Sequence, residues 1–227
     1  MKKFNFFLYK VLIASKPGRW LLNTRFKSKY ISSAGYWENR YKKNGTSGVG
    51  SYGRLAIYKS TYLNRFVADN KIVKVLELGC GDGNQLQQFD FREYIGLDVS
   101  PMAIEKCRKL FPNNRSRKFF IYDDQVFAKQ RQLLTAELVI SLDVLYHLLE
   151  DDVFEKYVRR MFAASSRFVI IYSWNEERAK SLHMRYRKFT SWIEKNITGW
   201  HLKEIIKNEV PNLEACDFYI YTKNYSL

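Results

Sequence analysis

The chain has 227 residues and a mass of 27.0 kDa, the size of one domain with room for a short appendage. Hydrophobic residues make up 46% of the chain and aromatic residues 16%, too much apolar material for a disordered protein. The three widely spaced cysteines, Cys80, Cys107 and Cys216, exclude a disulfide scaffold and show no metal-ligand spacing. We therefore expect a reducing, cytoplasmic location and no metal site.

The net charge of +15 is concentrated in the N-terminal third. Residues 1–70 contain 14 Lys and Arg against two acids, whereas residues 71–227 contain 24 against 21. This uneven distribution argues against a uniformly basic body that binds nucleic acid. We divide the chain into a basic, aromatic extension over residues 1–35 and one domain over residues 36–227.

The extension contains no apolar run of the roughly 18 residues that span a bilayer. Residues 4–14 look like a signal peptide, but Asn5 and Lys10 interrupt the apolar stretch and no small-residue cleavage site follows. On a helix, five apolar residues of this stretch would share one face and two lysines another, which is typical of a helix on an anionic membrane surface. A helix packed on its own domain or on a second subunit would show the same pattern. Membrane contact through residues 1–30 and packing on protein both stay open.

Strand-like and helix-like segments alternate from residue 74 onward. A helix is expected from Pro101 to Pro112 and another from Asp151 to about Ala164. No helical pattern separates the last two strands, which predicts a C-terminal antiparallel hairpin. The expected class is α/β, with three layers around a doubly wound, mostly parallel sheet. Its seven expected strands cover residues 74–78, 94–99, 118–122, 137–142, 168–172, 200–207 and 217–222.

A glycine-rich motif follows the first expected strand. Gly79, Gly81 and Gly83 stand between this strand and an expected helix, where glycines allow a sharp turn and the close approach of a ligand. Glu77, two residues before the first glycine, can hold a ligand cation. Asp98 ends the next strand, 19 residues after Gly79, where a carboxylate accepts both hydroxyls of a ribose.

These residues resemble the class I S-adenosylmethionine-dependent methyltransferases. Residues 77–83 (ELGCGDG) resemble the first motif of that family and residues 96–103 (GLDVSPMA) the second. Residues 122–124 (YDD) resemble the third and residues 142–148 (LDVLYHL) the fourth, so the resemblance covers about residues 36–222 in order. A nicotinamide-binding domain would instead require Gly-x-Gly-x-x-Gly, and position 84 is Asn.

The resemblance implies S-adenosylmethionine as cofactor. The glycine loop would pass under its methionine part, Asp98 would bind the ribose, Val99 and Met102 would enclose the adenine, and Asp123 or Asp124 would accept from the adenine amino group. Leu142 and Asp143 would face the methionine amine, and Cys80 would be a small turn residue rather than a nucleophile. The full set of implied cofactor residues is Trp37, Arg40, Glu77, Gly79, Cys80, Gly81, Asp82, Gly83, Asp98, Val99, Met102, Asp123, Asp124 and Leu142.

Residues 36–41 (YWENRY) predict a helix that caps the cofactor, as in related methyltransferases. The Gly/Ser-rich residues 45–53 that follow are either a mobile lid whose amides meet an anion or an ordinary linker. The combination resembles bacterial methyltransferases associated with surface-polysaccharide biosynthesis and their capsule genes. This resemblance implies a glycan or its activated precursor as methyl acceptor.

The catalytic candidates are His147 and Asp143, which follow the fourth expected strand. Methyl transfer to a hydroxyl requires a base, and His147 is placed to be one, oriented by Asp143. A packing role, or a contact with the cofactor, explains His147 equally well.

Candidate substrate residues lie in three places. Tyr52 belongs to the glycine-rich run and Tyr146 precedes His147. If residues 183–189 are extended, His183, Arg185 and Arg187 point the same way and form a cationic fork for a phosphate or carboxylate. If this segment is a solvated loop, its charges carry no such function.

The fourth motif lacks the Asn/Asp-Pro-Pro-aromatic pattern of enzymes that methylate nucleic-acid amino groups. We therefore expect O-methylation of a hydroxyl or phosphate-type oxygen (phosphate or phosphoramidate) on an anionic small molecule or glycan precursor. The alternatives are an RNA methyltransferase that grips phosphate with its basic N-terminus, and a non-catalytic module that binds the cofactor or a partner. Nucleic acid is the less expected partner.

Overall fold

The computed structural model describes residues 32–178, 183–211 and 216–224. The stretch expected to contact a membrane, residues 1–30, lies outside the described residues. In the described part, seven strands form one sheet in the order β3-β2-β1-β4-β5-β7-β6. The strands are β1 (Lys74–Leu78), β2 (Glu93–Asp98), β3 (Arg117–Ile121), β4 (Ala136–Leu142), β5 (Ser165–Ser173), β6 (Trp200–Ile206) and β7 (Asp217–Lys223).

The five strands from β1 to β5 are parallel, and β7 pairs antiparallel with both β5 and β6. This arrangement confirms the predicted α/β fold with its C-terminal hairpin. The expected strands match the observed ones closely because most contain a short apolar run bounded by polar or turn residues, a signal that is local in sequence.

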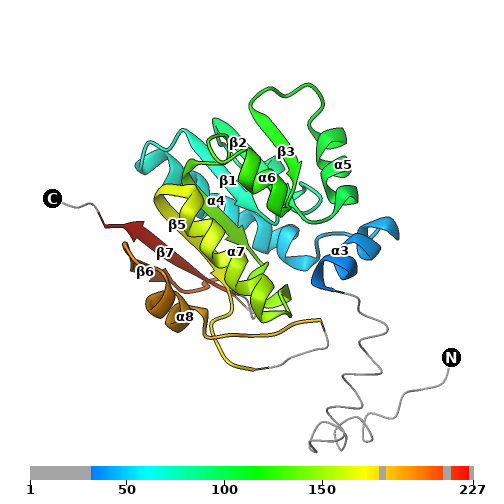
Figure 1. Ribbon diagram of the computed structural model, residues 1–227. Coiled ribbons are helices and arrows are strands. Elements are labelled where there is room, and N and C mark those ends of the chain that lie inside the picture. The colour runs from blue at the N-terminus through cyan, green and yellow to red at the C-terminus, as the bar shows by residue number, and fades with distance from the viewer. Residues whose placement is uncertain (1–31, 179–182, 212–215, 225–227) are drawn as a thin grey trace, which may run out of the picture.

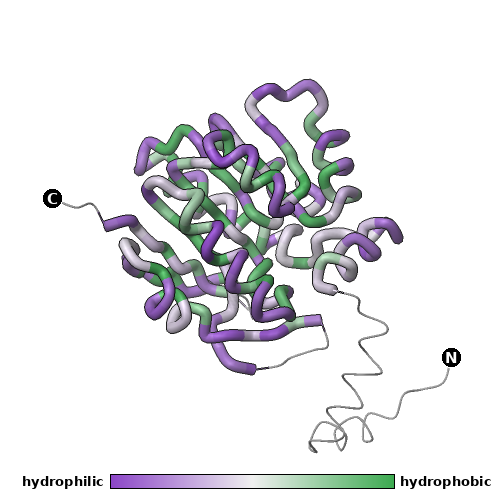
Figure 2. Tube along the Cα trace, in the orientation of Figure 1, coloured by the Kyte–Doolittle hydropathy of each residue, from purple (hydrophilic) through white to green (hydrophobic). Residues whose placement is uncertain are grey.

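Helices cover both faces of the sheet, so the fold has three layers (Figure 1). The helices α4 (Gly53–Asp69) and α5 (Pro101–Leu110) pack on one face, where Leu63 and Ile104 meet Val75 of β1. The helices α6 (Asp124–Lys129), α7 (Asp151–Ala164) and α8 (Phe189–Asn196) pack on the other, where α7 meets Leu76. Neighbouring residues of β1 point to opposite faces, so apolar residues run along the central strands while the outer helix surfaces are polar (Figure 2).

The two expected helices begin as predicted. Helix α5 starts at Pro101, and the Ser100 side chain caps it by accepting a hydrogen bond from the Ala103 amide at 3.1 Å. Helix α7 spans the predicted residues and buries one stripe of apolar side chains against β4 and β5. Its first turn carries Asp151 and Asp152, which suit the positive end of the helix dipole.

The helix expected directly after the glycine loop is wrong. One short 3-10 turn, η2 (Gln85–Gln88), follows the loop instead. The nine residues between Gly83 and Glu93 must return along the length of β1, about 17 Å for five residues at 3.3 Å each. Nine helical residues rise only about 13.5 Å, so a helix here is too short for the connection.

Helix α4 is absent from the expected elements, although its buried residues recur with helical spacing. Ala56, Leu63 and Val67 face the sheet, and Lys59 and Ser60 lie on the same buried face. The two polar residues interrupt the apolar stripe in the sequence, which conceals the helix.

The helix α3 (Ser33–Lys42) contains the helix predicted over residues 36–41 and packs beside α5. It runs through the expected domain boundary between residues 35 and 36, and the Ser32 hydroxyl caps it by accepting from the Gly35 amide. Residues 32–35 therefore pack with the domain.

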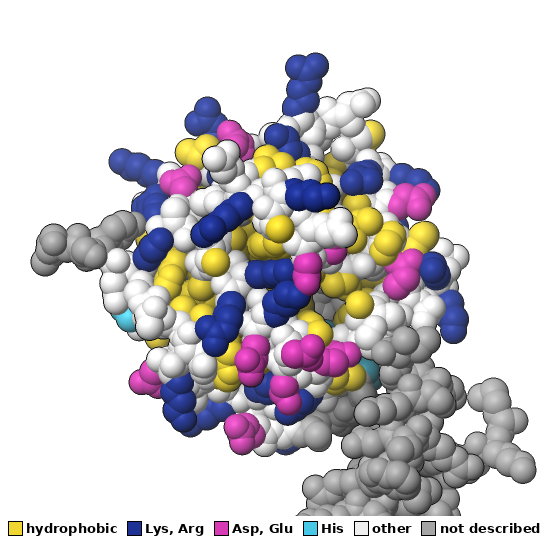
Figure 3. All heavy atoms as spheres, in the orientation of Figure 1, with side chains coloured by type: hydrophobic (Ala, Val, Ile, Leu, Met, Phe, Trp, Pro, Cys, Tyr) yellow, Lys and Arg dark blue, Asp and Glu magenta, His cyan; other side chains and the backbone are white. Residues whose placement is uncertain are grey.

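The visible surface mixes the two signs of charge: Lys and Arg side chains alternate with Asp and Glu over the face shown in Figure 3. This agrees with the near-balanced charge of residues 71–227. In the part of the chain that is described, no helix is long and apolar enough to cross a membrane.

Candidate active site

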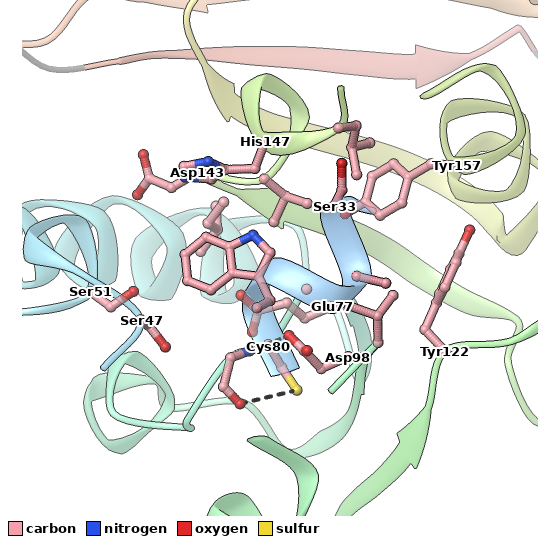
Figure 4. Close-up of a pocket in the computed structure, with 18 of the residues that line it drawn as sticks. Ser33, Ser47, Ser51, Glu77, Cys80, Asp98, Tyr122, Asp143, His147 and Tyr157 are labelled. Atoms are coloured by element: carbon pink, nitrogen blue, oxygen red, sulfur yellow. Dashed lines mark hydrogen bonds between the residues drawn. The ribbon is translucent and has the colours of Figure 1, made fainter. Parts of the chain in front are cut away.

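A cavity of about 140 Å³ opens at the carboxyl ends of β1 and β4. These strands are neighbours in the sheet, but the chain leaves them in opposite directions, toward β2 and toward β5. Such a switch in strand order leaves a crevice where ligands bind in open α/β sheets. Figure 4 shows Glu77 and Asp98 on one side of this cavity and Asp143 and His147 on the other.

The glycine loop forms the floor of the cavity with a backbone that other residues do not readily adopt. Gly79 has φ +83° and Gly81 has φ +58°. A Cβ at Gly79 would collide with the Val144 side chain, and one at Gly81 with the Ser47 hydroxyl. Both glycines are therefore required for the close packing of this loop.

Two buried carboxylates stand beside the loop. Asp98 accepts hydrogen bonds from the amides of Gly81 at 3.0 Å and Ser100 at 2.9 Å, and Glu77 accepts one from the Tyr94 hydroxyl at 2.5 Å. Burial raises the pKa of Glu77 to about 7 and that of Asp98 to about 6. A ligand that offers a cation or hydroxyl donors would stabilise the ionised form of both carboxylates.

These features fit S-adenosylmethionine: the loop requires two glycines, and neither Glu77 nor Asp98 forms an ion pair with a lysine or arginine of the described residues. Trp37, Gly79, Cys80, Val99 and Leu142, which the resemblance assigned to this cofactor, line the same cavity.

Helix α3 closes the cavity and is held at two points. At its middle, Glu38 accepts hydrogen bonds from the Ser100 hydroxyl at 2.5 Å and the Met102 amide at 3.3 Å. At its start, Ser33 donates its hydroxyl to Glu150 at 2.5 Å and accepts from the Leu149 amide at 3.0 Å. The helix thus joins the start of α5 to the loop before α7.

Asp82 holds the glycine-rich run 45–53 rather than lining the cavity. Its Oδ2 accepts from the Ser47 amide and from the Tyr52 hydroxyl, both at 2.9 Å. The backbone amide of Asp82 in turn donates to the Ser47 hydroxyl. This run is therefore bonded to the glycine loop, and its interpretation as a mobile lid or an ordinary linker stays a prediction. The carboxylate also engages Tyr52, an expected substrate residue.

His147 lies on the cavity wall in the 3-10 turn η3 (Leu145–His147). Its Nδ1 is 3.3 Å from the carbonyl oxygen of His183, and its ring meets Trp37 edge-on at 4.9 Å. Burial lowers the pKa of His147 to about 4, so the ring is neutral at physiological pH. The expected orientation by Asp143 is wrong, because the ring nitrogen contacts the His183 carbonyl instead.

Asp143 forms an ion pair that the sequence analysis missed. Its Oδ2 lies 2.6 Å from Nζ of Lys59, whose side chain is 1% exposed. Its Oδ1 accepts from the Tyr146 hydroxyl at 3.0 Å and from the Cys216 thiol at 3.5 Å. Tyr146, expected to contact substrate, is thus tied to Asp143.

Asp123 and Asp124 lie in a neighbouring groove that shares Val99 and Tyr122 with the cavity. Asp123 caps α6 by accepting from the Val126 amide at 2.7 Å. Asp124 is bonded to Lys156 and Arg160 of α7, and these partners lower its pKa. Among the described residues, Asp124 thus forms ion pairs, whereas Asp123 uses one carboxylate oxygen for the helix cap and forms no ion pair.

The expected cationic fork is not formed. Arg185 and Arg187 both pair with Asp151, at 2.9 and 3.1 Å, and both donate to the Leu149 carbonyl. His183 instead stacks on Tyr36, with ring centroids 5.2 Å apart. Two of the three side chains therefore turn to the start of α7 and one to α3. Their binding of substrate stays a prediction.

Among the predicted residues, the cavity wall brings together Trp37, Glu77, Gly79, Cys80, Gly81, Asp98, Val99, Leu142, Asp143 and His147. The others stand outside it: Arg40, Tyr52, Asp82, Gly83, Met102, Asp123, Asp124, Tyr146, His183, Arg185 and Arg187. Of these, Arg40 donates to the Thr46 carbonyl and lies over the Trp37 ring, and Gly83 packs against Cys107.

The wall residues that sequence reasoning missed include Ser33, Tyr41, Ser47, Lys59 and Glu150. A signal existed for Lys59 alone, since a single lysine on the apolar face of a helix is unusual.

Comparisons with known proteins agree with this geometry. The sequence model of a family described as a methyltransferase domain matches residues 76–166. No curated protein matches the chain.

Solved structures share the fold at low sequence identity. The N-methyltransferase NodS from Bradyrhizobium japonicum WM9, in complex with S-adenosyl-L-homocysteine, has a TM-score of 0.63 at 13% identity, over 85% of this chain and 98% of that one. Magnesium protoporphyrin IX methyltransferase from Synechocystis PCC 6803, with bound S-adenosylmethionine, has a TM-score of 0.60 at 12% identity, over 86% and 99%. The small RNA methyltransferase HEN1 has a TM-score of 0.57 at 16% identity, over 78% of this chain and 26% of that one.

At these identities the solved structures show a common fold, while the matched family segment covers β1 to the start of β5, where the glycine loop, Asp98 and His147 lie. The protein is an S-adenosylmethionine-dependent methyltransferase with the Rossmann-like fold of class I.

Proposed function

We propose that the protein methylates a hydroxyl oxygen and that His147 accepts the proton of that hydroxyl. The observation that carries this proposal is a neutral histidine on the cavity wall whose Nδ1 lies beside the His183 carbonyl. A neutral ring that donates from Nδ1 leaves the lone pair of Nε2 as an acceptor. The tautomer follows from this hydrogen bond, because a carbonyl oxygen can only accept.

The bound cofactor supplies an activated methyl group on a sulfonium, so the protein chiefly has to place the acceptor and remove one proton. Trp37 packs edge-on against His147 and holds the ring in place. Helix α3, held to Glu150 through Ser33, covers the same side of the cavity and excludes water. His147 is thus positioned to take a proton in a site that solvent does not compete for.

A hydroxyl fits these contacts better than a phosphate-type oxygen. A phosphate would favour free cations, yet Arg185 and Arg187 already bond to Asp151 and to backbone carbonyls. A neutral base has no role in methylating a phosphate oxygen that is already ionised, whereas a hydroxyl needs one.

As acceptor we propose a hydroxyl of a bacterial surface glycan or of its nucleotide- or lipid-linked precursor. The support is the resemblance of residues 36–53 to methyltransferases associated with polysaccharide genes. A cytoplasmic location at the inner face of the membrane accompanies this proposal. It rests on the basic, aromatic pattern of residues 1–30, which joins the described chain at Ser32 beside the cavity.

RNA is the second candidate acceptor, favoured by a groove of about 690 Å³ on the α5–β3 connection. In the described chain this groove is lined by four cations, Arg108, Arg115, Arg117 and Lys118, and by no acidic side chain. The connection leads into the amino end of β3, whereas the cavity lies at the carboxyl ends of the strands. Only a long polyanion would therefore reach both.

Transfer of a labelled methyl group tests the proposal. The full chain is incubated with methyl-tritiated S-adenosylmethionine and, separately, with surface glycan, lipid-linked precursors, nucleotide sugars and total RNA from the organism that carries the gene. We expect label in a glycan or precursor fraction, and an O-methyl sugar one methylene unit heavier than its parent by mass spectrometry. Label in RNA alone, with a steep dependence on salt, would overturn the hydroxyl-glycan proposal in favour of RNA.

A further inference from the structure

Lys59 is a buried cation on the wall of the cofactor cavity, and neither the family resemblance nor the proposed chemistry uses it. It projects from the second turn of α4, where its side chain is 1% exposed. Withdrawing an ammonium group from water is costly even when the group is paired, so buried ion pairs are weak devices for stability. The position of Lys59 therefore calls for a functional explanation.

Three groups surround the ammonium. Nζ lies 2.6 Å from Oδ2 of Asp143 and 5.2 Å from the centre of the Tyr172 ring. Gly50 covers the ion pair from the glycine-rich run, where an added Cβ would come within 2.5 Å of the same Oδ2. Among the described residues, Nζ donates its hydrogen bond to Asp143, whereas an ammonium has three donors to offer.

The described cavity wall carries one cation, and the cofactor carries one anion. Glu77, Asp98, Asp143 and Glu150 are the acids of the described wall, and Lys59 is its one lysine or arginine. S-adenosylmethionine carries two cations, the sulfonium and the amine, and one anion, the carboxylate of its methionine part. A single anion on the ligand thus meets a single cation on the protein.

Lys59 also lies at the correct end of the cavity. Its positive charge acts on Glu77, where it opposes the effect of burial on the pKa. Its ion-pair partner Asp143 directly follows β4, and Figure 4 shows Asp143 and Tyr122 at opposite sides of the cavity. Lys59 therefore stands near the loop and not near the expected adenine position.

We propose that Lys59 binds the carboxylate of the methionine part of S-adenosylmethionine, while Asp143 holds the ammonium in the position from which it reaches this group. The pair of opposite charges on the protein then faces the amine and the carboxylate of the ligand. Asp143 acts here as a positioning residue, because its own oxygens already accept from Lys59, Tyr146 and Cys216.

Two ligands that differ only in the carboxylate test this assignment without any methyl acceptor. Dissociation constants of the full chain for S-adenosylmethionine and for decarboxylated S-adenosylmethionine are measured by titration calorimetry. A charge-assisted hydrogen bond predicts that the wild-type chain prefers the intact cofactor by about 10- to 100-fold. Equal affinity of the wild-type chain for the two ligands overturns the proposal.

The variant Lys59→Met should lose this preference, so that the two dissociation constants agree within about threefold. Lys59→Arg, which retains the cation, should keep most of the preference. Lys74→Met is the control, since Lys74 is a partly buried lysine at the start of β1 that bonds to the Leu133 carbonyl, away from the cavity. It should retain the wild-type ratio.

The double variant Lys59→Met with Asp143→Asn covers the case in which an unpaired Asp143 prevents folding of the single variant. It too should bind the two ligands equally. A Lys59→Met chain, or the double variant, that still prefers the intact cofactor overturns the proposal, because a structural role for Lys59 weakens both ligands alike. None of these outcomes depends on which oxygen the enzyme methylates.

Discussion

The two sides of the cavity are built differently. The cofactor side comes from one short stretch of chain, residues 77–100, in which Asp98 bonds to the amide of Gly81. The opposite side is assembled from three distant segments, in which Ser33 meets Glu150 and the His147 ring lies between Trp37 and His183. The difference shows that local backbone geometry holds the glycine loop and its carboxylates, whereas long-range packing holds the wall around His147.

The same physical cause sets the charge on both sides. Burial favours the neutral form of any ionisable group, so it raises the pKa of Glu77 to about 7 and lowers that of His147 to about 4. On the cofactor side, a bound cation would favour the ionised form of the carboxylates and lower their pKa values again. On the opposite side, burial leaves the imidazole neutral, with a free lone pair, but also makes it a weaker base than an exposed histidine.

The largest expected effect separates the two sides by function. His147→Ala should lower kcat about 100- to 1000-fold, because the acceptor hydroxyl loses its base. The affinity for S-adenosylmethionine should change by less than about threefold, a small free-energy difference. Label transfer to the methylated glycan fraction measures the first quantity and calorimetry the second.

His201→Ala is the control for this variant, since His201 is exposed on β6 and bonds to Asn224. It should leave both quantities at the wild-type value. An unchanged kcat for His147→Ala would assign His147 to packing and remove the proposed base.

A smaller effect, of about tenfold, is expected for the pH dependence of cofactor affinity. Affinity for S-adenosylmethionine should rise between pH 5.5 and pH 8, as Glu77 and Asp98 lose their protons and become able to pair with a cation. The cofactor-free protein should lose stability over the same range, because its native state holds protons that the unfolded state has already released. The increase in Tm on adding cofactor should therefore be larger at pH 8 than at pH 5.5.

Glu77→Gln serves as the comparison for this pH dependence, because an amide does not titrate. We expect it to flatten much of the pH dependence and to weaken binding at pH 8. An affinity that is the same at both pH values in the wild-type chain would show that these carboxylates are already ionised without ligand.

The smallest effect tests the long-range packing itself. Ser33→Ala removes the hydroxyl that donates to Glu150 and accepts from the Leu149 amide, and should lower the free energy of unfolding by about 1 kcal/mol. Urea unfolding measures this loss. Ser116→Ala is the control, since that exposed hydroxyl bonds only to nearby Asn114 in the described chain. Equal stability of the two variants would show that α3 is not held through Ser33.

Sequence reasoning succeeded where a short segment carries its own signal. Most of the seven strands contain a short apolar run, and Gly79, Gly81 and Asp98 belong to a pattern that one strand–turn–strand unit defines. It failed for α4, whose apolar stripe contains Lys59 and Ser60, and for the helix expected after Gly83, which the length of β1 forbids.

The sequence also did not predict which residues bond across the fold. Asp82 and Arg187 are ordinary charged residues in the sequence, and only folding shows that one bonds to Ser47 and the other to Asp151. The predicted pairing of His147 with Asp143 had the right neighbourhood but the wrong contact, because the carbonyl of His183 lies on a segment 36 residues away.

By itself, the sequence determined the α/β class, the order of its strands along the chain, the glycine loop and the carboxylates that flank it. These are short-range properties, set by side-chain periodicity and by the few residues that tolerate a positive φ. Only the tertiary structure decided that Lys59 meets Asp143, that α3 is joined to Glu150 and that the two arginines turn away from the cavity. Such contacts depend on where separate helices and strands pack, and the pairing energy of two buried groups exists only once that packing is complete.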